Sequence, residues 1–357
     1  MKTVVVGILV GLTLAVTGAE AAPAAKPANH AKVPPGFFGM VPLTDPSAAD
    51  ARAMSAAGVQ SLRLLVYWEL AEPTPGNYDW SYYDSIFTNI ASAGLSTAAQ
   101  FSSTPRWLSD NANRPPIYSS AQIAAWQGFL TNFARRYGPR GTFWAEHASL
   151  PYRPVTSWEI WNEANLTGFW GGPPSARDYL GLLRASGTAI RGVDPAARIV
   201  FSGLFPFPTP GEGVKALKFL NAFYAAGGTN KMFDALSLHP YSVSPKDLIP
   251  TCRRFRNFLN RHGGRRIAIW ITELGWGTGG HIPNTFYRTT EPKQAAYLTR
   301  SFKALIEARR SLRLQRVFWV TWRDLGGSNN TFFNMGLLRA DGSAKPAYYA
   351  YRRLALR

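Results

Sequence analysis

The sequence has only one cysteine, Cys252, among its 357 residues. An intramolecular disulfide bond is therefore excluded, and the fold must be held by a large apolar core, which a chain of this length can provide. A lone thiol is most often inert and buried, so catalysis by Cys252 is not favoured.

Acidic residues are scarce, because 21 Asp and Glu stand against 39 Lys and Arg, for a net charge of +18. Such a balance predicts attraction to polyanions and favours an anionic glycan as one hypothesis for the substrate. No nucleic-acid-binding motif accompanies the charge, so no specific nucleic-acid partner is expected. We interpret the densest basic cluster as a solvated surface. It consists of Arg253, Arg254, Arg256, Arg261, Arg265 and Arg266.

Long apolar runs are confined to the beginning of the chain. Lys2, the apolar run Val4–Val16 and the small residues around Glu20 are typical of a signal peptide. That run is shorter than the roughly 20 residues that a membrane-spanning helix needs, and no transmembrane segment is expected elsewhere. We predict a signal peptide over residues 1–21, a flexible Ala/Pro/Lys leader over 22–35 and one catalytic domain over 36–357. The protein is expected to be secreted, extracellular or associated with the cell wall.

Repeats and linkers are absent from residues 36–357, where short β-rich runs alternate with longer amphipathic segments. The expected strands are Phe37–Pro42, Ser61–Tyr67, Ser96–Phe101, Val155–Trp161, Arg198–Gly203, Ala235–His239, Ile267–Thr272 and Arg316–Thr321. The expected helices are Ser47–Ala57, Tyr82–Ala93, Ala121–Tyr137, Ala176–Arg191, Val214–Ala225, Asp247–Arg261, Lys293–Arg310 and Ala344–Leu354. Eight of each in alternation predict an α/β fold, the (β/α)₈ TIM barrel. The first strand–helix loop lacks a Gly-x-Gly-x-x-Gly fingerprint, which disfavours dinucleotide binding.

Two glutamates stand at the ends of expected strands, each in a tryptophan-rich stretch. Glu163 follows the strand that ends at Trp161, and Glu273 follows the strand that ends at Thr272. Functional side chains of a barrel lie at the carboxyl ends of its strands. A carboxylate in apolar surroundings is costly unless it has a partner or a task. A facing pair suits glycoside hydrolysis, in which one carboxyl donates a proton and the other attacks the sugar or activates water.

These motifs resemble the clan A glycoside hydrolases. The likeness is carried by Trp161-Asn162-Glu163, by Thr272-Glu273, by Tyr67–Pro73 with Gly76–Trp80, and by Ser237–Tyr241. Within the clan, the chain is most similar to the family 39 and family 5 types, over about residues 36–350. The resemblance implies a retaining enzyme that forms a covalent glycosyl-enzyme, with Glu163 as acid/base and Glu273 as nucleophile.

The resemblance also implies roles for neighbouring side chains. Asn162 is expected to hydrogen-bond the sugar 2-hydroxyl, Tyr241 to hydrogen-bond the nucleophile and His239 to line the site. Arg63 is expected to keep the nucleophile ionised, since a nearby positive charge lowers the pKa of a carboxyl. Glu159, deeper in its strand, is expected to pair with Arg63.

Tryptophans are expected to form the walls of the sugar site. Trp322 is expected to be the sugar platform, with ordinary barrel packing as the alternative, and Trp68 is a candidate for a subsite wall, with interior packing as the alternative. Further candidates for such walls are Trp107, Trp170 and Trp276.

Other kinds of site and function have weaker support. The spacing of His239 and Asp234 matches no metal-ligand pattern, so no metal and no cofactor are expected. A non-catalytic carbohydrate- or cell-wall-binding barrel remains an alternative, as does a basic polyanion-binding protein whose barrel is incidental. The presence of both glutamates with Asn162 and Tyr241 favours the enzyme.

Overall fold

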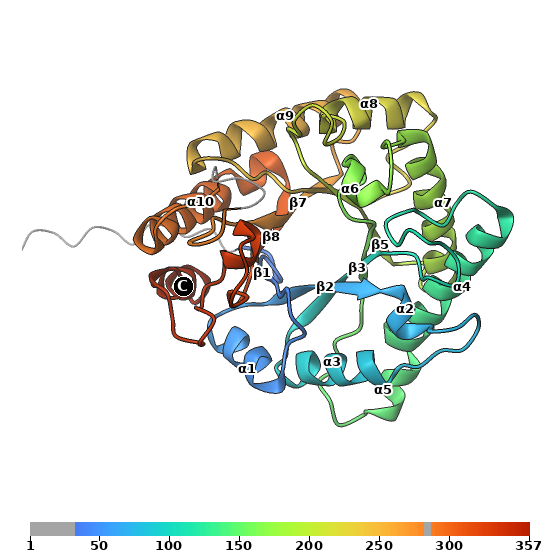
Figure 1. Cartoon of the computed structure of the whole chain (residues 1–357), viewed down its shortest axis with the longest axis horizontal. Helices are drawn as coiled ribbons and strands as arrows, with labels where there is room; N and C mark the ends of the chain where they lie inside the picture. Colours follow the sequence, from blue (N-terminus) through green and yellow to red (C-terminus); the bar gives the residue numbers. More distant parts are fainter. Residues whose placement is uncertain (1–32, 282–286) are drawn as a thin grey trace, which may run out of the picture. The chain divides into compact units, whose positions relative to one another are not determined.

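The computed structural model describes residues 33–281 and 287–357. The expected signal peptide and residues 22–32 of the leader lie outside the described residues. Within Val33–Arg357, eight parallel strands close into a barrel in sequence order, and helices surround it (Figure 1). The prediction of a (β/α)₈ barrel is therefore confirmed.

The strands agree with the expected ones to within a residue or two. They are β1 (Phe38–Val41), β2 (Ser61–Tyr67), β3 (Ser96–Ser102), β4 (Ser157–Ile160), β5 (Arg198–Leu204), β6 (Ala235–Leu238), β7 (Ala268–Leu274) and β8 (Leu314–Val320). The barrel closes where β1 pairs with β8, for example Phe38 with Val317. β7 runs past its expected end, so Glu273 lies in the strand itself.

The eight expected helices are likewise present. They are α1 (Ala48–Ala56), α3 (Ser81–Ser92), α4 (Ser120–Tyr137), α7 (Ala176–Val193), α8 (Ala216–Ala225), α9 (Leu248–Arg261), α10 (Glu291–Leu312) and α11 (Pro346–Ala355). Serine side chains at Ser47, Ser119 and Ser175 accept a hydrogen bond from the first turn of α1, α4 and α7, which explains their clear starts. Short helical turns in the loops were not anticipated, because so few residues show no helical period. They are α2 (Trp68–Ala71), α5 (Thr142–Glu146), α6 (Thr167–Trp170), η1 (Pro245–Asp247) and η2 (Thr331–Asn334).

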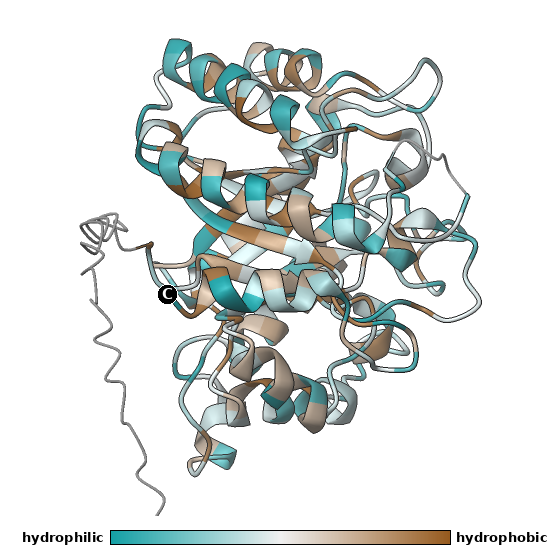
Figure 2. Cartoon of the chain, turned by 90° about the vertical axis from the view of Figure 1, so that its left-hand side faces the viewer, coloured by the Kyte–Doolittle hydropathy of each residue, from teal (hydrophilic) through white to brown (hydrophobic). Residues whose placement is uncertain are grey.

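Two apolar clusters hold the barrel together. The larger lies between strands and helices and includes Leu62 and Leu64 of β2. The smaller fills the barrel and includes Ala98, Val200 and Phe318. The helices accordingly carry both hydrophilic and hydrophobic residues (Figure 2). Because side chains alternate along a strand, β1, β3, β5, β6, β7 and β8 each contribute to both clusters. The last inward residue of a barrel strand reaches the barrel mouth.

The basic cluster around Cys252 is not uniformly solvated. Arg256 is buried, and its guanidinium donates to the backbone carbonyls of Gly264 and Ile267, each at 2.6 Å. It therefore fixes the turn between α9 and β7, which corrects the interpretation of this residue as surface. Arg253 and Arg254 are exposed, as expected.

Within residues 33–281 and 287–357, no helix is both long enough and apolar enough to cross a membrane.

Candidate active site

A cavity of about 440 Å³ opens at the carboxyl ends of the strands. Asn162, Glu163, Tyr241 and Glu273 line it together. They come from β4, β6 and β7 and the residues that directly follow these strands. The cavity therefore lies at the carboxyl ends of the strands, where the functional sites of barrel proteins are found. Its volume is typical of sites that bind small molecules.

Glu163 and Glu273 meet in this cavity, although 110 positions of sequence separate them. A carboxylate oxygen of each, together with a ring nitrogen of His239, lies within 4.8 Å of the others. Two carboxyl groups this close cannot both ionise freely, because their charges repel in a medium of low dielectric constant.

Arg63 is the centre of the charge network beneath the cavity. Its guanidinium donates to Glu159 Oε2 at 2.6 Å, to Glu273 Oε1 at 2.8 Å and to Asn162 Oδ1 at 2.9 Å. The arginine is fully buried, so its charge is balanced by Glu159 and Glu273 and not by water. Glu159 is further held by the hydroxyl of Ser237 at 2.9 Å. The expected Arg63–Glu159 pair is present, and Arg63 also reaches the candidate nucleophile.

His239 and Tyr241 each contact one of the two glutamates. His239 Nδ1 lies 2.8 Å from Glu163 Oε1, and its Nε2 lies 3.0 Å from Thr272 Oγ1. The Tyr241 hydroxyl donates to Glu273 Oε2 at 2.9 Å. Burial and the charge of Arg63 hold the pKa of His239 well below its usual value, so the imidazole is neutral. One ring nitrogen therefore donates while the other accepts.

The surroundings of the two glutamates affect their pKa values differently. Burial raises the pKa of Glu163 well above its usual value, and the charge of Glu273 raises it further. Burial also raises the pKa of Glu273, but the charge of Arg63 and the hydrogen bond from Tyr241 oppose that rise. The environment thus favours a protonated Glu163 beside an ionised Glu273, which is the division of roles that an acid and a nucleophile need.

The backbone is strained where it presents Glu163. Trp161 and Glu163 have φ angles of 68° and 41°, in the left-handed region that side chains other than glycine rarely adopt. Each such residue costs about 1–3 kcal/mol, so the surrounding contacts must impose the conformation. Asn165 does this in part. Its buried amide donates to the carbonyls of Phe205 and Val214, both at 2.8 Å, and accepts from Phe205 N at 3.2 Å.

The expected tryptophan platform is not found at the cavity. Trp322 is only 3% exposed, packs on Tyr348 of α11 and donates its indole N–H to Asp50 Oδ1 at 3.2 Å. Trp68 is fully buried, stacks on Phe129 and donates to Glu72 Oε2 at 2.6 Å. Neither lines the cavity, so we correct both assignments. A sugar cannot stack on a face that protein atoms already cover.

Other aromatic residues line the cavity in place of these tryptophans, and they were not assigned to the sugar site from the sequence. They are Tyr67, Trp161, Phe169, Phe332 and Phe333, in addition to Tyr241. The other candidates for walls, Trp107, Trp170 and Trp276, do not line it.

Two unpaired polar atoms also border the cavity. Gln100 Nε2 and Ser103 Oγ are buried and have no hydrogen-bond partner within the described part of the chain. A buried donor without a partner costs about 1–3 kcal/mol, so a bound ligand that pairs with it recovers that free energy. The alternation of side chains along β3 would have indicated Gln100 as a residue of the cavity, because Ala98 and Gln100 share the inward face of the strand.

The potential ligand atoms of Glu163, His239 and Glu273 are close enough together to bind one cation. Their ligand atoms are already engaged, however, because Arg63 and Tyr241 donate to Glu273 and His239 contacts Glu163 and Thr272. The nearby guanidinium charge also opposes a cation at this position. The expectation of a metal-independent site stays a prediction.

Gly203 on β5 gives His239 the space that it occupies. A Cβ built on Gly203 would collide with the imidazole. We expect Gly203→Ala to displace the ring from Glu163, lower activity at least about tenfold and cost about 1–3 kcal/mol of stability through overpacking. Turnover and urea unfolding measure both effects. Gly181→Ala on α7, where the added Cβ meets nothing, is the control and should be neutral or stabilising. Unchanged turnover in Gly203→Ala would show that the position of His239 is unimportant.

The raised pKa of Glu163 also predicts how stability depends on pH. A carboxyl whose pKa is higher in the folded state favours folding below its unfolded pKa of about 4.3, and this stabilisation is lost as the pH rises through the folded value. Glu163→Gln should therefore melt higher than the wild type, by roughly 2 °C at neutral pH, with a difference that vanishes near pH 4. Thermal melts across this range test the trend. The exposed Glu69→Gln is the control, and a constant difference would contradict the prediction.

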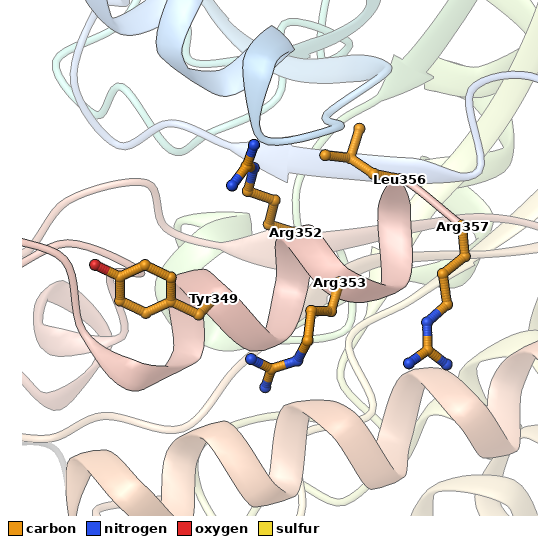
Figure 3. A pocket seen from close by; sticks show the side chains of 5 residues that line it. All are labelled: Tyr349, Arg352, Arg353, Leu356 and Arg357. Carbon is orange, nitrogen blue, oxygen red and sulfur yellow. The ribbon is translucent and has the colours of Figure 1, made fainter.

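A second hollow lies on α11, lined by Tyr349, Arg352, Arg353, Leu356 and Arg357 (Figure 3). Arg353 and Arg357 point to one side of the helix, and Arg352 points to the other. The end of α11 packs against Gly58, just before β2 begins, so this hollow lies at the amino ends of the strands. It contains no acid or nucleophile and is opposite to the cavity that holds the glutamates.

Comparisons with known proteins lead to glycoside hydrolases. A family model described as beta-galactosidase, of glycosyl hydrolase family 42, matches residues 44–121. No curated protein matches the sequence. Among solved structures, a family 39 glycoside hydrolase from Bacteroides cellulosilyticus is 23% identical with a TM-score of 0.70, over 90% of this chain and 64% of that one.

Two further solved structures show the same relation. A β-xylosidase from Caulobacter crescentus is 17% identical with a TM-score of 0.65, over 90% of this chain and 68% of its own. An exo-β-1,4-mannosidase from an Opitutaceae bacterium is 17% identical with a TM-score of 0.60, over 90% and 59%. The TM-scores show a likeness in fold although the sequence identities are low. This chain spans 64% of the length of the family 39 enzyme. Together with the family 42 match, the likeness in fold supports the resemblance to clan A glycoside hydrolases.

Proposed function

We propose that this protein is a secreted retaining glycoside hydrolase that cleaves O-glycosidic bonds of a poly- or oligosaccharide. One observation carries the proposal. Two carboxyl groups from β4 and β7, with oxygens within 4.8 Å of one another, face one cavity in environments that separate their pKa values. Retaining glycosidases hold their carboxyls about 5–5.5 Å apart, and inverting ones about 6.5–9.5 Å. The shorter spacing favours double displacement.

In the first step, the Glu273 carboxylate attacks the anomeric carbon and forms a glycosyl ester. The bond to the leaving oxygen breaks, and Glu163 gives its proton to that oxygen. In the second step, Glu163 takes a proton from water, and the resulting hydroxide attacks the same carbon and releases Glu273. Two inversions at one centre leave the configuration of the sugar unchanged.

The coupling between the glutamates supports both roles of Glu163. The negative charge of Glu273 helps to keep Glu163 protonated before the reaction. Once Glu273 is esterified, that charge is gone, so the pKa of Glu163 falls and its carboxylate can act as a base. Arg63 stays balanced by Glu159 throughout, and the Tyr241 hydroxyl remains a donor at the nucleophile.

The cavity also offers the groups that a sugar needs. Asn162, Gln100 and Ser103 line it with polar side chains. Within the described residues, Gln100 Nε2 and Ser103 Oγ have no partner to give up. The exposed faces of Tyr67 and Phe169 provide apolar surface against which a sugar ring can lie. We assign Asn162 to the 2-hydroxyl, in keeping with its hydrogen bond from Arg63, which engages the amide oxygen and so assigns the donor role to the amide N–H₂.

The proposed secretion follows from the sequence of residues 1–21. The protein expressed in a secreting host should appear in the medium with a mass that corresponds to cleavage near Ala21 or Ala22. A full-length product that stays in the cell would contradict this part of the proposal.

The decisive experiment uses the purified mature protein. It is incubated with a panel of aryl glycosides and polysaccharides, and the first-formed product is followed by NMR. We expect at least one sugar to be released with its original anomeric configuration, which later mutarotates. An inverted first product would overturn the retaining mechanism. Glycan binding without any release would instead support the non-catalytic carbohydrate-binding alternative.

A further inference from the structure

A third hollow, of about 420 Å³, adjoins the active-site cavity. Tyr241 belongs to both, because its hydroxyl contacts Glu273 while its ring borders the neighbouring hollow. The other walls come from the loop after β5, with Phe207, and from the loop after β6 and the start of α9, with Val243 and Arg254. The two hollows therefore share a wall.

The order of the strands around the barrel favours the leaving-group side for this hollow. In the proposed mechanism, Glu163 gives its proton to the leaving oxygen, so the leaving sugar lies toward β4. Strands β5 and β6 follow β4 around the barrel, and their loops form the hollow.

The walls combine exposed apolar surface with an unpaired charge. Phe207 is 48% exposed and Val243 is 59% exposed, although both are apolar. The Arg254 guanidinium lies over the Phe207 ring, 5.9 Å from its centroid. Among the residues that the structure describes, no carboxylate pairs with Arg254, whereas nearby Arg256 is buried and bound to carbonyls. Arg254 is thus free to bind a ligand.

Asp247 stands on the same hollow and limits which ligand fits. Its charge offsets that of Arg254, so the hollow does not attract anions by net charge alone. A carboxylate must be bound by geometry at Arg254, with hydroxyl groups available to donate to Asp247. A sugar ring that carries a carboxylate at one edge and hydroxyls at the other meets both requirements.

We propose that this hollow is a leaving-group subsite for an acidic sugar, a uronate whose carboxylate binds Arg254 and whose ring packs against the exposed apolar surface of Phe207 and Val243. The inference rests on the proposed glycosidase function and adds the substrate class to it. It also separates recognition by one arginine from the general attraction of a chain with net charge +18. Recognition at the subsite requires Arg254, whereas the attraction due to net charge depends equally on every exposed cation.

The test measures binding in a Glu273→Gln background, which prevents turnover. The probes are oligosaccharides that carry glucuronate, galacturonate or mannuronate, each paired with its carboxyl-reduced form. We expect at least one acidic probe to bind roughly five- to tenfold more tightly than its reduced partner. Arg254→Ala should remove this preference, and Phe207→Ala should weaken both forms equally. Arg253→Ala removes the same charge from the adjacent exposed position outside the hollow and should change nothing.

Each remaining outcome separates the two proposals. If the wild type hydrolyses aryl glycosides but no probe loses affinity on carboxyl reduction, the acidic subsite is wrong and the enzyme stands. An equal loss of preference in Arg253→Ala and Arg254→Ala also overturns it, because the surface charge would then act without a site. A preserved preference in a protein that hydrolyses no glycoside overturns the proposed function alone.

Discussion

Replacement of Glu273 by alanine should lower kcat by at least about 10⁴-fold on every glycoside that the wild type hydrolyses. The reason is chemical, because the proposed mechanism assigns the covalent bond to the anomeric carbon to this carboxylate. Arg63 and Tyr241 both donate to it, and neither a guanidinium nor a phenol held as a donor can take its place as the nucleophile. Steady-state turnover of an activated aryl glycoside measures the loss.

Two controls separate chemistry from folding in this experiment. Glu69→Ala removes a carboxylate from the exposed loop after β2 and should keep full activity. Added azide should partly restore turnover in Glu273→Ala, since a small anion can enter the space left by the side chain and attack the sugar. The product would then be a glycosyl azide of inverted configuration. Turnover within tenfold of the wild type in Glu273→Ala would remove the assigned nucleophile.

The sequence was sufficient to predict the barrel and the meeting of Glu163 and Glu273 at its mouth, for the same physical reason. Strands of a barrel are buried on both faces, so they appear as short apolar runs that contrast with the amphipathic helices between them. Once the strands are placed, the barrel brings their carboxyl ends to one mouth. Glu163 and Glu273 therefore meet regardless of the sequence between them.

The tryptophan assignments failed because a side chain at a strand end can point either way. On β2, Arg63, Leu65 and Tyr67 share the inward face, so alternation favours Tyr67 and not Trp68 as the residue at the cavity. On β8, Phe318 and Val320 point inward, and strict alternation would have continued to Trp322. The strand ends at Val320, however, and beyond that residue alternation no longer applies.

The support around Glu163 could not be predicted from motifs. Gly203 matters because it leaves space for His239, and Asn165 matters because it bonds to backbone groups 40 and 49 positions away. Such contacts depend on loop paths and not on local pattern. Left-handed φ angles at Trp161 and Glu163 likewise arise only when the surroundings impose them.

Replacement of Glu163 by alanine should give a loss that depends on the leaving group. For a sugar or another poor leaving group, the first step needs a proton donor, and we expect turnover to fall by about 10²–10⁴-fold. For a dinitrophenyl glycoside, whose leaving oxygen needs no proton, the first step should proceed nearly as in the wild type. The covalent glycosyl-enzyme should then accumulate, because its hydrolysis lacks a base.

The pH dependence tests the same assignment independently. In the wild type, kcat/KM should fall on the basic side as Glu163 loses its proton, at a pH above the usual range of a glutamate because burial and the charge of Glu273 raise its pKa. It should fall on the acidic side as Glu273 becomes protonated. Glu163→Ala should lose the basic limb and keep the acidic one, since Arg63 and Tyr241 still hold Glu273. A basic limb that survives in Glu163→Ala would mean that another group supplies the proton. An equal loss of turnover on all leaving groups would mean that Glu163 maintains the structure of the cavity and does not transfer a proton.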